Sequence, residues 1–280
     1  MKISLISFIV LMCWVILAQS CFKMRITDDQ AKKEFTEKGL QLNIKTIVAD
    51  HFKLHYVISG NDTLPTLFFV HGSPGSWDAY KQYLEDTDLL AKYRMVSIDR
   101  PGFGYSQFGE AKNLTEQSGI ISPLIDLLKN GKPLYIIGHS LGGPLAVQIV
   151  ADNPGKFYGM VLLAAAVDKA EEPAEKWRGF VNNSPFQYLL PGAFRPSNTE
   201  IWYLKKDLIG LAGQFEKITC KVWIIHGDKD DFVPVGNAAY AKKMLVNAKS
   251  VEIKILSGAP HFIPWEPWYK DVKSVLLNMN

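Results

Sequence analysis

The segment from Leu134 to Val150 contains a serine whose neighbours can make it a nucleophile. The segment begins as a run of strand-forming residues, ends as an apolar helix, and turns between them at the sequence GHSLG of residues 138–142. A chain that passes from strand to helix within about two residues needs small residues on both sides of the corner. The corner residue, Ser140, is then exposed at a helix N-terminus, where backbone amides and the helix dipole favour a developing negative charge. Ser140 is therefore the candidate nucleophile.

The loop HGSPG, which follows the first long apolar strand, can supply the donors for that negative charge. Gly72 has no side chain, so its backbone can approach the serine closely. Pro74 has no amide hydrogen. We therefore expect the backbone amides of Ser73 and Leu141 to form an oxyanion hole, and His71 to brace the loop rather than to exchange protons.

A serine hydroxyl also needs a base, and the base needs an orienting acid. His261 lies in the loop LSGAPHF, between the last apolar strand and a C-terminal helix. Three acids, Asp228, Asp230 and Asp231, follow the strand KVWIIHG, and Asp168 ends the strand VLLAAAVD. All of these residues lie at or after the ends of strands, which places them at one edge of a parallel sheet.

The order of these motifs, HG, GxSxG, GxxDxxVP and a late GxxHF, resembles that of the α/β-hydrolase superfamily over residues 46–280. The resemblance implies that Ser140 is the nucleophile, Asp230 the acid and His261 the base. Some members of the superfamily place the acid where Asp168 stands, so that residue remains the alternative. The HGSPG loop resembles loops of epoxide hydrolases and dehalogenases. Those enzymes, however, carry an aspartate at the strand–helix corner, the elbow, where this chain has Ser140.

The remaining pattern is that of an α/β protein with one insertion. Short apolar runs alternate with helical stretches from residue 66 onward, which indicates a mostly parallel, doubly wound sheet. The two parts of this core are predicted at 46–167 and 212–280. Residues 168–211 interrupt the alternation and are predicted to form a small cap whose aromatic residues shape a closed pocket, with the core of a small subdomain as the alternative. These aromatic residues are Trp177, Phe180, Phe186, Tyr188, Phe194, Trp202 and Tyr203.

The N-terminus is predicted to be an export signal over residues 1–20, outside the fold. An apolar run follows Lys2 and leads to the sequence AQSC, which resembles a bacterial lipoprotein processing site with lipidation at Cys21. Ordinary signal cleavage and an uncleaved anchor are the alternatives, and all three place the domain outside the cytoplasm. Residues 21–45 are predicted to be a tether with a short helix at 28–38.

Composition excludes several classes of function. The net charge is only +3, and no basic run with interleaved aromatic residues occurs, so nucleic acid is not expected as a partner. No metal site or cofactor motif is predicted, because His51 and His55 on the expected wet face of a hairpin strand have no third ligand nearby. Cys220 is expected to be buried and inert.

We therefore expect an exported, membrane-tethered serine hydrolase that cleaves a carboxylic ester of small to medium size through an acyl-enzyme. Amide or carbon–carbon bond hydrolysis, or perhydrolysis, on the same residues is the alternative, and a non-catalytic binding protein of this fold is a further one. The partners expected are a small-molecule ester and a membrane. The sequence does not fix the oligomeric state.

Overall fold

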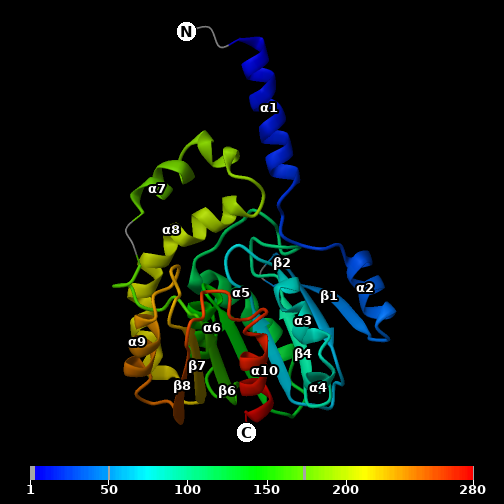
Figure 1. Ribbon diagram of the computed structural model, residues 1–280, viewed down its shortest axis with the longest axis vertical. Helices are drawn as coiled ribbons and strands as arrows, with labels where there is room; N and C mark the ends of the chain where they lie inside the picture. Colours follow the sequence, from blue (N-terminus) through cyan, green and yellow to red (C-terminus); the bar gives the residue numbers. More distant parts are fainter. Residues whose placement is uncertain (1–3, 50, 173–174, 280) are drawn as a thin grey trace.

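The computed structural model describes residues 4–49, 51–172 and 175–279. The ends of the predicted signal segment and of the second core part (1–3 and 280), one position of the first core part (50) and two of the cap (173–174) lie outside these residues. The fold is one eight-stranded sheet with helices on both faces and a helical cap at one end (Figure 1).

The sheet has the order β1-β2-β4-β3-β5-β6-β7-β8. Strands β3 to β8 run parallel, whereas β1 and β2 form an antiparallel hairpin that pairs with β4. The central strands consist of buried residues throughout, as expected where helices cover both faces. The strands are β1 (Leu42–Ala49), β2 (Phe52–Ser59), β3 (Thr66–Val70), β4 (Arg94–Ile98), β5 (Leu134–His139), β6 (Gly159–Leu163), β7 (Lys221–Gly227) and β8 (Ser250–Leu256).

The helices divide into two covering layers, a cap and an N-terminal extension. α5 and α6 lie on one face of the sheet, and α2, α3, α4 and α10 lie on the other. The α-helices are α1 (Leu5–Ser20), α2 (Asp28–Glu37), α3 (Lys81–Leu84), α4 (Thr87–Leu90), α5 (Leu114–Leu127), α6 (Gly142–Asp152), α7 (Lys176–Asn182), α8 (Phe194–Leu211), α9 (Gly236–Met244) and α10 (Tyr269–Asn278). Three 3₁₀ turns complete the list: η1 (Trp77–Tyr80), η2 (Pro185–Leu189) and η3 (Ala212–Lys217).

The cap begins after β6 and consists of α7, η2 and α8. α8 is its longest helix and lies across the carboxyl ends of the parallel strands (Figure 1). This is the edge at which open α/β sheets bind their ligands. The α/β fold with a mostly parallel, doubly wound sheet is confirmed.

Residues 1–20, predicted to be an export signal outside the fold, contact the cap at their C-terminal end in the full chain. α1 projects from the body, but its last turns are held by η2 and the cap loop that follows it (Figure 1). The Trp14 indole donates to the Leu189 carbonyl at 3.2 Å, and the Gln19 amide donates to the carbonyls of Tyr188 and Leu190 at 3.0 and 2.9 Å. The Gly192 amide donates to the carbonyl of Ala18 at 2.7 Å, and Ala18 is buried.

His55 corrects a second expectation, because it is buried rather than on a wet face. Its Nδ1 atom lies 2.8 Å from Asp99 Oδ2, and its Nε2 atom lies 3.4 Å from Asp28 Oδ1. The alternation along β2 does place His55 opposite the apolar residues, but Asp28 of α2 and the loop after β4 cover that side. His51 is exposed, as expected.

Candidate active site

Ser140 stands at the corner between β5 and α6 in a left-handed backbone conformation, with φ of +53°. Its amide donates to the Leu163 carbonyl at 2.9 Å, which ties the corner to the neighbouring strand. A side chain at Gly138 would place its Cβ atom 2.2 Å from the carbonyl oxygen of Gly142. A side chain at Gly142 would lie 2.3 Å from the carbonyl oxygen of Val70. The glycines are therefore required by the close approach of the backbone.

His261 and Asp230 form a buried pair beside this corner. His261 Nδ1 lies 2.7 Å from Asp230 Oδ2, and the other Asp230 oxygen accepts from the amides of Phe232 and Val233 at 3.0 and 2.8 Å. Burial alone would raise the pKa of Asp230, but hydrogen bonds from His226, His261 and the Val233 amide outweigh it and hold that pKa well below its usual range. Asp230 is thus a carboxylate that orients the imidazole.

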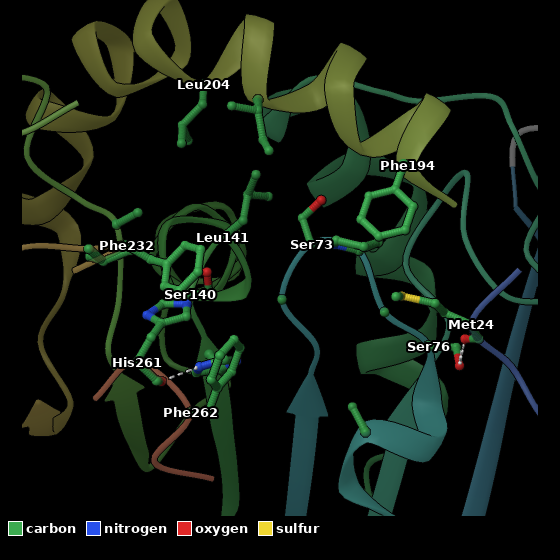
Figure 2. A pocket seen from close by; sticks show the side chains of 18 of the residues that line it. Met24, Ser73, Ser76, Ser140, Leu141, Phe194, Leu204, Phe232, His261 and Phe262 are labelled. Atoms are coloured by element: carbon green, nitrogen blue, oxygen red, sulfur yellow. Dashed lines mark hydrogen bonds between the residues drawn. The ribbon is translucent and has the colours of Figure 1, made fainter. Parts of the chain in front are cut away.

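Figure 2 shows the Ser140 side chain next to the His261 ring in the same cavity. The structure therefore brings together the three residues that the sequence places 90 and 31 positions apart. Such an arrangement of hydroxyl, imidazole and carboxylate can pass a proton from the serine to the histidine.

The other acids occupy different positions. β6 ends at Leu163, so Asp168 lies in the following loop, where its carboxylate accepts from the Ala170 amide at 2.9 Å. Asp228 is exposed and accepts from the Gly258 amide at 2.7 Å, as a turn former does. Asp231 is exposed at the cavity rim. Asp230 alone of these acids contacts His261 within the described part of the chain.

The loop after β3 lies directly against the elbow. A Cβ atom added to Gly72 would be 3.0 Å from the Ser140 Cβ atom. Within the described residues, the backbone amides of Ser73 and Leu141 donate no hydrogen bond to the protein. Both remain available to an oxygen bound at Ser140, which is what an oxyanion hole requires.

Three further histidines near the site, His71, His139 and His226, occupy structural positions. His71 Nδ1 lies 2.7 Å from the Gly72 carbonyl, while its Nε2 accepts from the Arg100 amide at 3.0 Å, so His71 braces the loop. Burial and the nearby Arg100 guanidinium lower the pKa of His71 well below its usual range. Burial, followed by the His261 charge, lowers the pKa of His139 to about 3. His226 Nε2 lies 2.8 Å from the Val233 carbonyl.

Ser140 and His261 line a cavity of about 880 Å³, a size typical of small-molecule sites. Its apolar wall includes Phe194 and Leu204 of α8 and Phe232 and Phe262 from the loops that carry Asp230 and His261 (Figure 2). Met24 also contributes, from the segment that connects α1 to α2. Sequence reasoning missed Met24, because no motif marks a tether residue as part of a pocket.

The prediction that the seven cap aromatic residues shape a closed pocket is wrong for most of them. All seven are at least 36% exposed, and among them only Phe194 lines the cavity at Ser140. Trp202 and Tyr203 line a second hollow, which is formed by α8, α7 and the segment before α7. From α8, Ile201 and Leu204 line the Ser140 cavity together with Phe194, and the other aromatic side chains of the cap lie outside it.

Groups of three or more potential metal ligands do not occur among residues 4–49, 51–172 and 175–279. Cys220 is buried, and burial raises the pKa of its thiol to about 11. Cys21 and Cys13 are exposed.

Comparison with known proteins agrees with this geometry. Residues 65–189 match the family model described as alpha/beta hydrolase fold. Epoxide hydrolase 1 of Caenorhabditis elegans is 31% identical over 105 residues, which is 36% of this chain and 25% of that protein. The pimeloyl-[acyl-carrier protein] methyl ester esterase of Shewanella oneidensis is 31% identical over 132 residues, 46% of this chain and 45% of that protein.

The fold is also that of solved hydrolase structures. The crystal structure of a putative lipase from Acinetobacter baumannii superposes with a TM-score of 0.65 at 19% identity, covering 90% of this chain and 95% of that one. The curated relatives are matched over less of their length, since the chain spans 25% to 45% of the first three. Fold, motif order and family model agree: residues 65–189 match the alpha/beta hydrolase family model, and the chain has the α/β-hydrolase fold.

Proposed function

We propose that this protein is a serine hydrolase that cleaves a carboxylic ester of small to medium size through an acyl-enzyme. The observation that carries the proposal is the 2.7 Å contact between His261 and a buried, ionised Asp230, beside a serine in a strained left-handed turn. Strained serine at a strand–helix corner is the geometry of a nucleophile elbow. Relatives that hydrolyse esters, such as the methyl ester esterase and a human monoglyceride lipase, support the same chemistry.

The reaction follows from the atoms in the cavity. His261 Nε2 takes the proton of the Ser140 hydroxyl as the serine oxygen bonds to the ester carbonyl carbon. The amides of Ser73 and Leu141 bind the carbonyl oxygen as it becomes negative. His261 then gives its proton to the leaving alcohol, and a water molecule, deprotonated by the same imidazole, releases the acid from Ser140.

Epoxide hydrolases are also among the relatives, but the elbow favours acyl transfer. In the resemblance drawn above, those enzymes carry an aspartate at the position of Ser140. Amide or carbon–carbon bond hydrolysis and perhydrolysis use the same serine route, and they remain the alternatives that a substrate panel separates from ester cleavage.

A fluorophosphonate probe tests the proposal directly, because it reacts covalently with an activated serine. We expect labelling of the wild-type protein at Ser140, located by peptide mass spectrometry, and none in Ser140→Ala. Turnover of p-nitrophenyl esters should fall by about a million-fold in Ser140→Ala and in His261→Ala, and the double variant should be no worse than either. A wild-type protein that is neither labelled nor active would leave the non-catalytic alternative.

We also propose that the N-terminal segment holds the enzyme at a membrane outside the cytoplasm. α1 contains 16 residues without a charge, and most of its apolar side chains are exposed. No helix among the described residues has both the length and the apolar character needed to cross a bilayer. α1 would measure about 24 Å against a hydrocarbon core of about 30 Å. We therefore expect a retained α1 to insert only partly, and a chain cleaved before Cys21 to be held by its lipid instead.

Two forms of the N-terminus are compatible with this attachment, and they differ in mass. The hydrogen bonds of Trp14, Ala18 and Gln19 to the cap support retention of α1. Lipidation at Cys21 would require cleavage before that residue and would remove those bonds. Intact-mass spectrometry of membrane-derived protein distinguishes a chain that keeps residues 1–20 from one that begins at an acylated Cys21, and Cys21→Ala should change only the second form.

A further inference from the structure

A buried ion pair connects the cap to the loop that carries the Ser73 amide. Arg100 follows β4 and has no exposed surface, and Glu200 of α8 is also buried. The guanidinium donates to both carboxylate oxygens of Glu200 at 2.8 Å. It also donates to the Gln117 side chain at 3.0 Å. Two charges removed from water in this way are costly unless they are paired, so each residue fixes the position of the other.

The same guanidinium contacts the loop HGSPG after β3, residues 71–75, which carries the Ser73 amide and is called the oxyanion loop below. Arg100 Nη2 donates to the Gly72 carbonyl at 2.9 Å, and His71 Nδ1 lies 2.7 Å from that oxygen. Because His71 Nε2 accepts the Arg100 amide proton, Nδ1 carries the hydrogen and donates. The Gly72 carbonyl and the Ser73 amide belong to one planar peptide unit. Holding the carbonyl on one side therefore directs the Ser73 N–H to the other.

A second contact joins Ser73, the other residue of this peptide unit, to α8. The Ser73 hydroxyl and the Ser197 hydroxyl lie 2.8 Å apart, and Ser197 stands three residues before Glu200 on one face of α8. Figure 2 shows Ser73 below the helix that carries Phe194, with its hydroxyl directed toward that helix. α8 thus holds the Gly72–Ser73 peptide at two points.

We propose that Glu200, Arg100 and Ser197 are positioning residues that let the cap helix α8 set the orientation of the Ser73 amide in the oxyanion hole. This inference rests on the proposed function. Hydrogen bonds to a peptide carbonyl also polarise its N–H, so the contacts strengthen the donor as well as aim it. Since an oxyanion forms only during the reaction, loss of this alignment should lower kcat and leave KM nearly unchanged.

The test compares Glu200→Gln and Ser197→Ala with wild type, using p-nitrophenyl butyrate. We expect kcat to fall about 10- to 100-fold in Glu200→Gln and about 3- to 10-fold in Ser197→Ala, with KM within about threefold. A boronic acid, which forms a tetrahedral adduct with a catalytic serine, should lose affinity by the same factor as kcat/KM. Asp207→Ala is the matched control, because Asp207 holds α8 to the Leu114 amide at 2.9 Å without contacting the oxyanion loop.

A double variant, Arg100→Met with Glu200→Leu, separates positioning from folding. Apolar residues of similar size can replace a buried ion pair without loss of stability. The double variant should keep a Tm close to that of wild type and still show the lower kcat, because the Gly72 carbonyl has lost the Arg100 donor and keeps only that of His71. Ser197→Ala, which removes one hydroxyl, provides the same measurement should the charge variants fail to fold.

Several results would overturn the inference. These are an unchanged kcat in folded Glu200→Gln or Ser197→Ala, a wild-type kcat in the double variant, or an equal loss in Asp207→Ala. An effect on KM alone would also contradict it. Failure of the proposed function is recognised separately, because the wild-type protein would then show neither fluorophosphonate labelling at Ser140 nor ester turnover.

Discussion

Asp230 gives the sharpest prediction for a single residue, because Asp168 is a matched alternative. Asp230→Asn should keep the fold but lower kcat by about ten-thousand-fold, since an amide cannot stabilise the imidazolium and favours the wrong tautomer. Asp168→Asn should leave kcat within about twofold, because its carboxylate bonds only within its own loop among the described residues. Steady-state kinetics on one ester measures both.

The reverse result would move the catalytic acid to the loop after β6. A large loss in Asp168→Asn with an active Asp230→Asn would require the cap to rearrange so that Asp168 reaches His261. Equal and moderate losses in both would indicate general destabilisation, which circular dichroism would detect.

Individual residues differed in how far the sequence could locate them. Ser140 and His261 stand in motifs whose spacing to a strand is fixed by backbone geometry, so their edge of the sheet could be predicted. Arg100 and Glu200 could not be paired, because they are 100 positions apart and neither belongs to a motif that indicates a partner.

At the scale of elements, the strand–turn–helix of β5 and α6 depends on its glycines. Gly138→Ala would bring a Cβ atom within 2.2 to 2.9 Å of three backbone atoms of α6, and backbone cannot move aside cheaply. We expect a loss of at least about 2–3 kcal/mol in urea unfolding, together with loss of activity.

Gly119→Ala is the control for that prediction. Gly119 lies exposed within α5 with no atom within 4 Å of an added Cβ. Alanine there should stabilise the protein by about 0.5–1 kcal/mol, because it reduces the entropy of the unfolded chain. Similar effects at both glycines would show that the close approach at Gly138 does not control stability.

The cap contains a carboxyl group that makes stability depend on pH. Burial, and secondarily the charge of Glu175, raises the pKa of Glu172 to about 7. A raised pKa in the folded state means that folding favours the neutral carboxyl group. Its contribution to the free energy of unfolding is therefore complete below the unfolded pKa near 4.5 and is lost as pH rises through about 7. Glu172→Gln is neutral at every pH. Its Tm should equal that of wild type at pH 4 and exceed it by about 2–6 °C at pH 8.5.

Glu216→Gln supplies the comparison, since Glu216 is exposed near the end of η3. Its effect on Tm should be small and the same at both pH values. A Glu172→Gln variant whose Tm differs from wild type equally at pH 4 and pH 8.5 would contradict the linkage.

The burial of an element could be predicted where its own apolar pattern determined which residues are buried. It could not be predicted where an element distant in the sequence covers one of its faces. The parallel strands appear as continuous apolar runs and were located correctly. The face of β2 that carries His55 was expected to be wet because alternation cannot show that α2 lies over it. The cap aromatic residues were assigned to the pocket by composition, whereas the structure leaves six of them outside the cavity, four on α7 and η2 and two on α8.

At the scale of the whole molecule, α1 and the cap project from the same end of the fold (Figure 1). The exposed cap residues include Trp177 and Phe180 of α7 and Phe186 of η2. The cap also carries Lys176 on α7 and Lys205 and Lys206 on α8. Aromatic side chains suit the boundary between headgroups and hydrocarbon, and lysines suit anionic headgroups. The Phe180 and Phe186 rings also pack against each other, with their centroids 5.7 Å apart, so these two exposed aromatic side chains form one patch. This arrangement supports the proposed membrane attachment and would direct the cap toward the lipid.

Charged residues in the middle of α1 test that attachment on the full chain. Ile9→Lys combined with Met12→Lys places two ammonium groups on exposed positions of an uncharged helix. Each lysine costs about 2.5–3.5 kcal/mol at the centre of an inserted helix, although its long side chain can reach toward the headgroups. We expect flotation with liposomes that contain anionic lipid to weaken at least about a hundredfold.

Val246→Lys is the control: at a residue that is 69% exposed in the core domain, it should float like wild type. All three proteins should hydrolyse a soluble ester equally in detergent, because the triad is untouched. Equal flotation of the double-lysine variant and wild type would show that α1 does not enter the lipid.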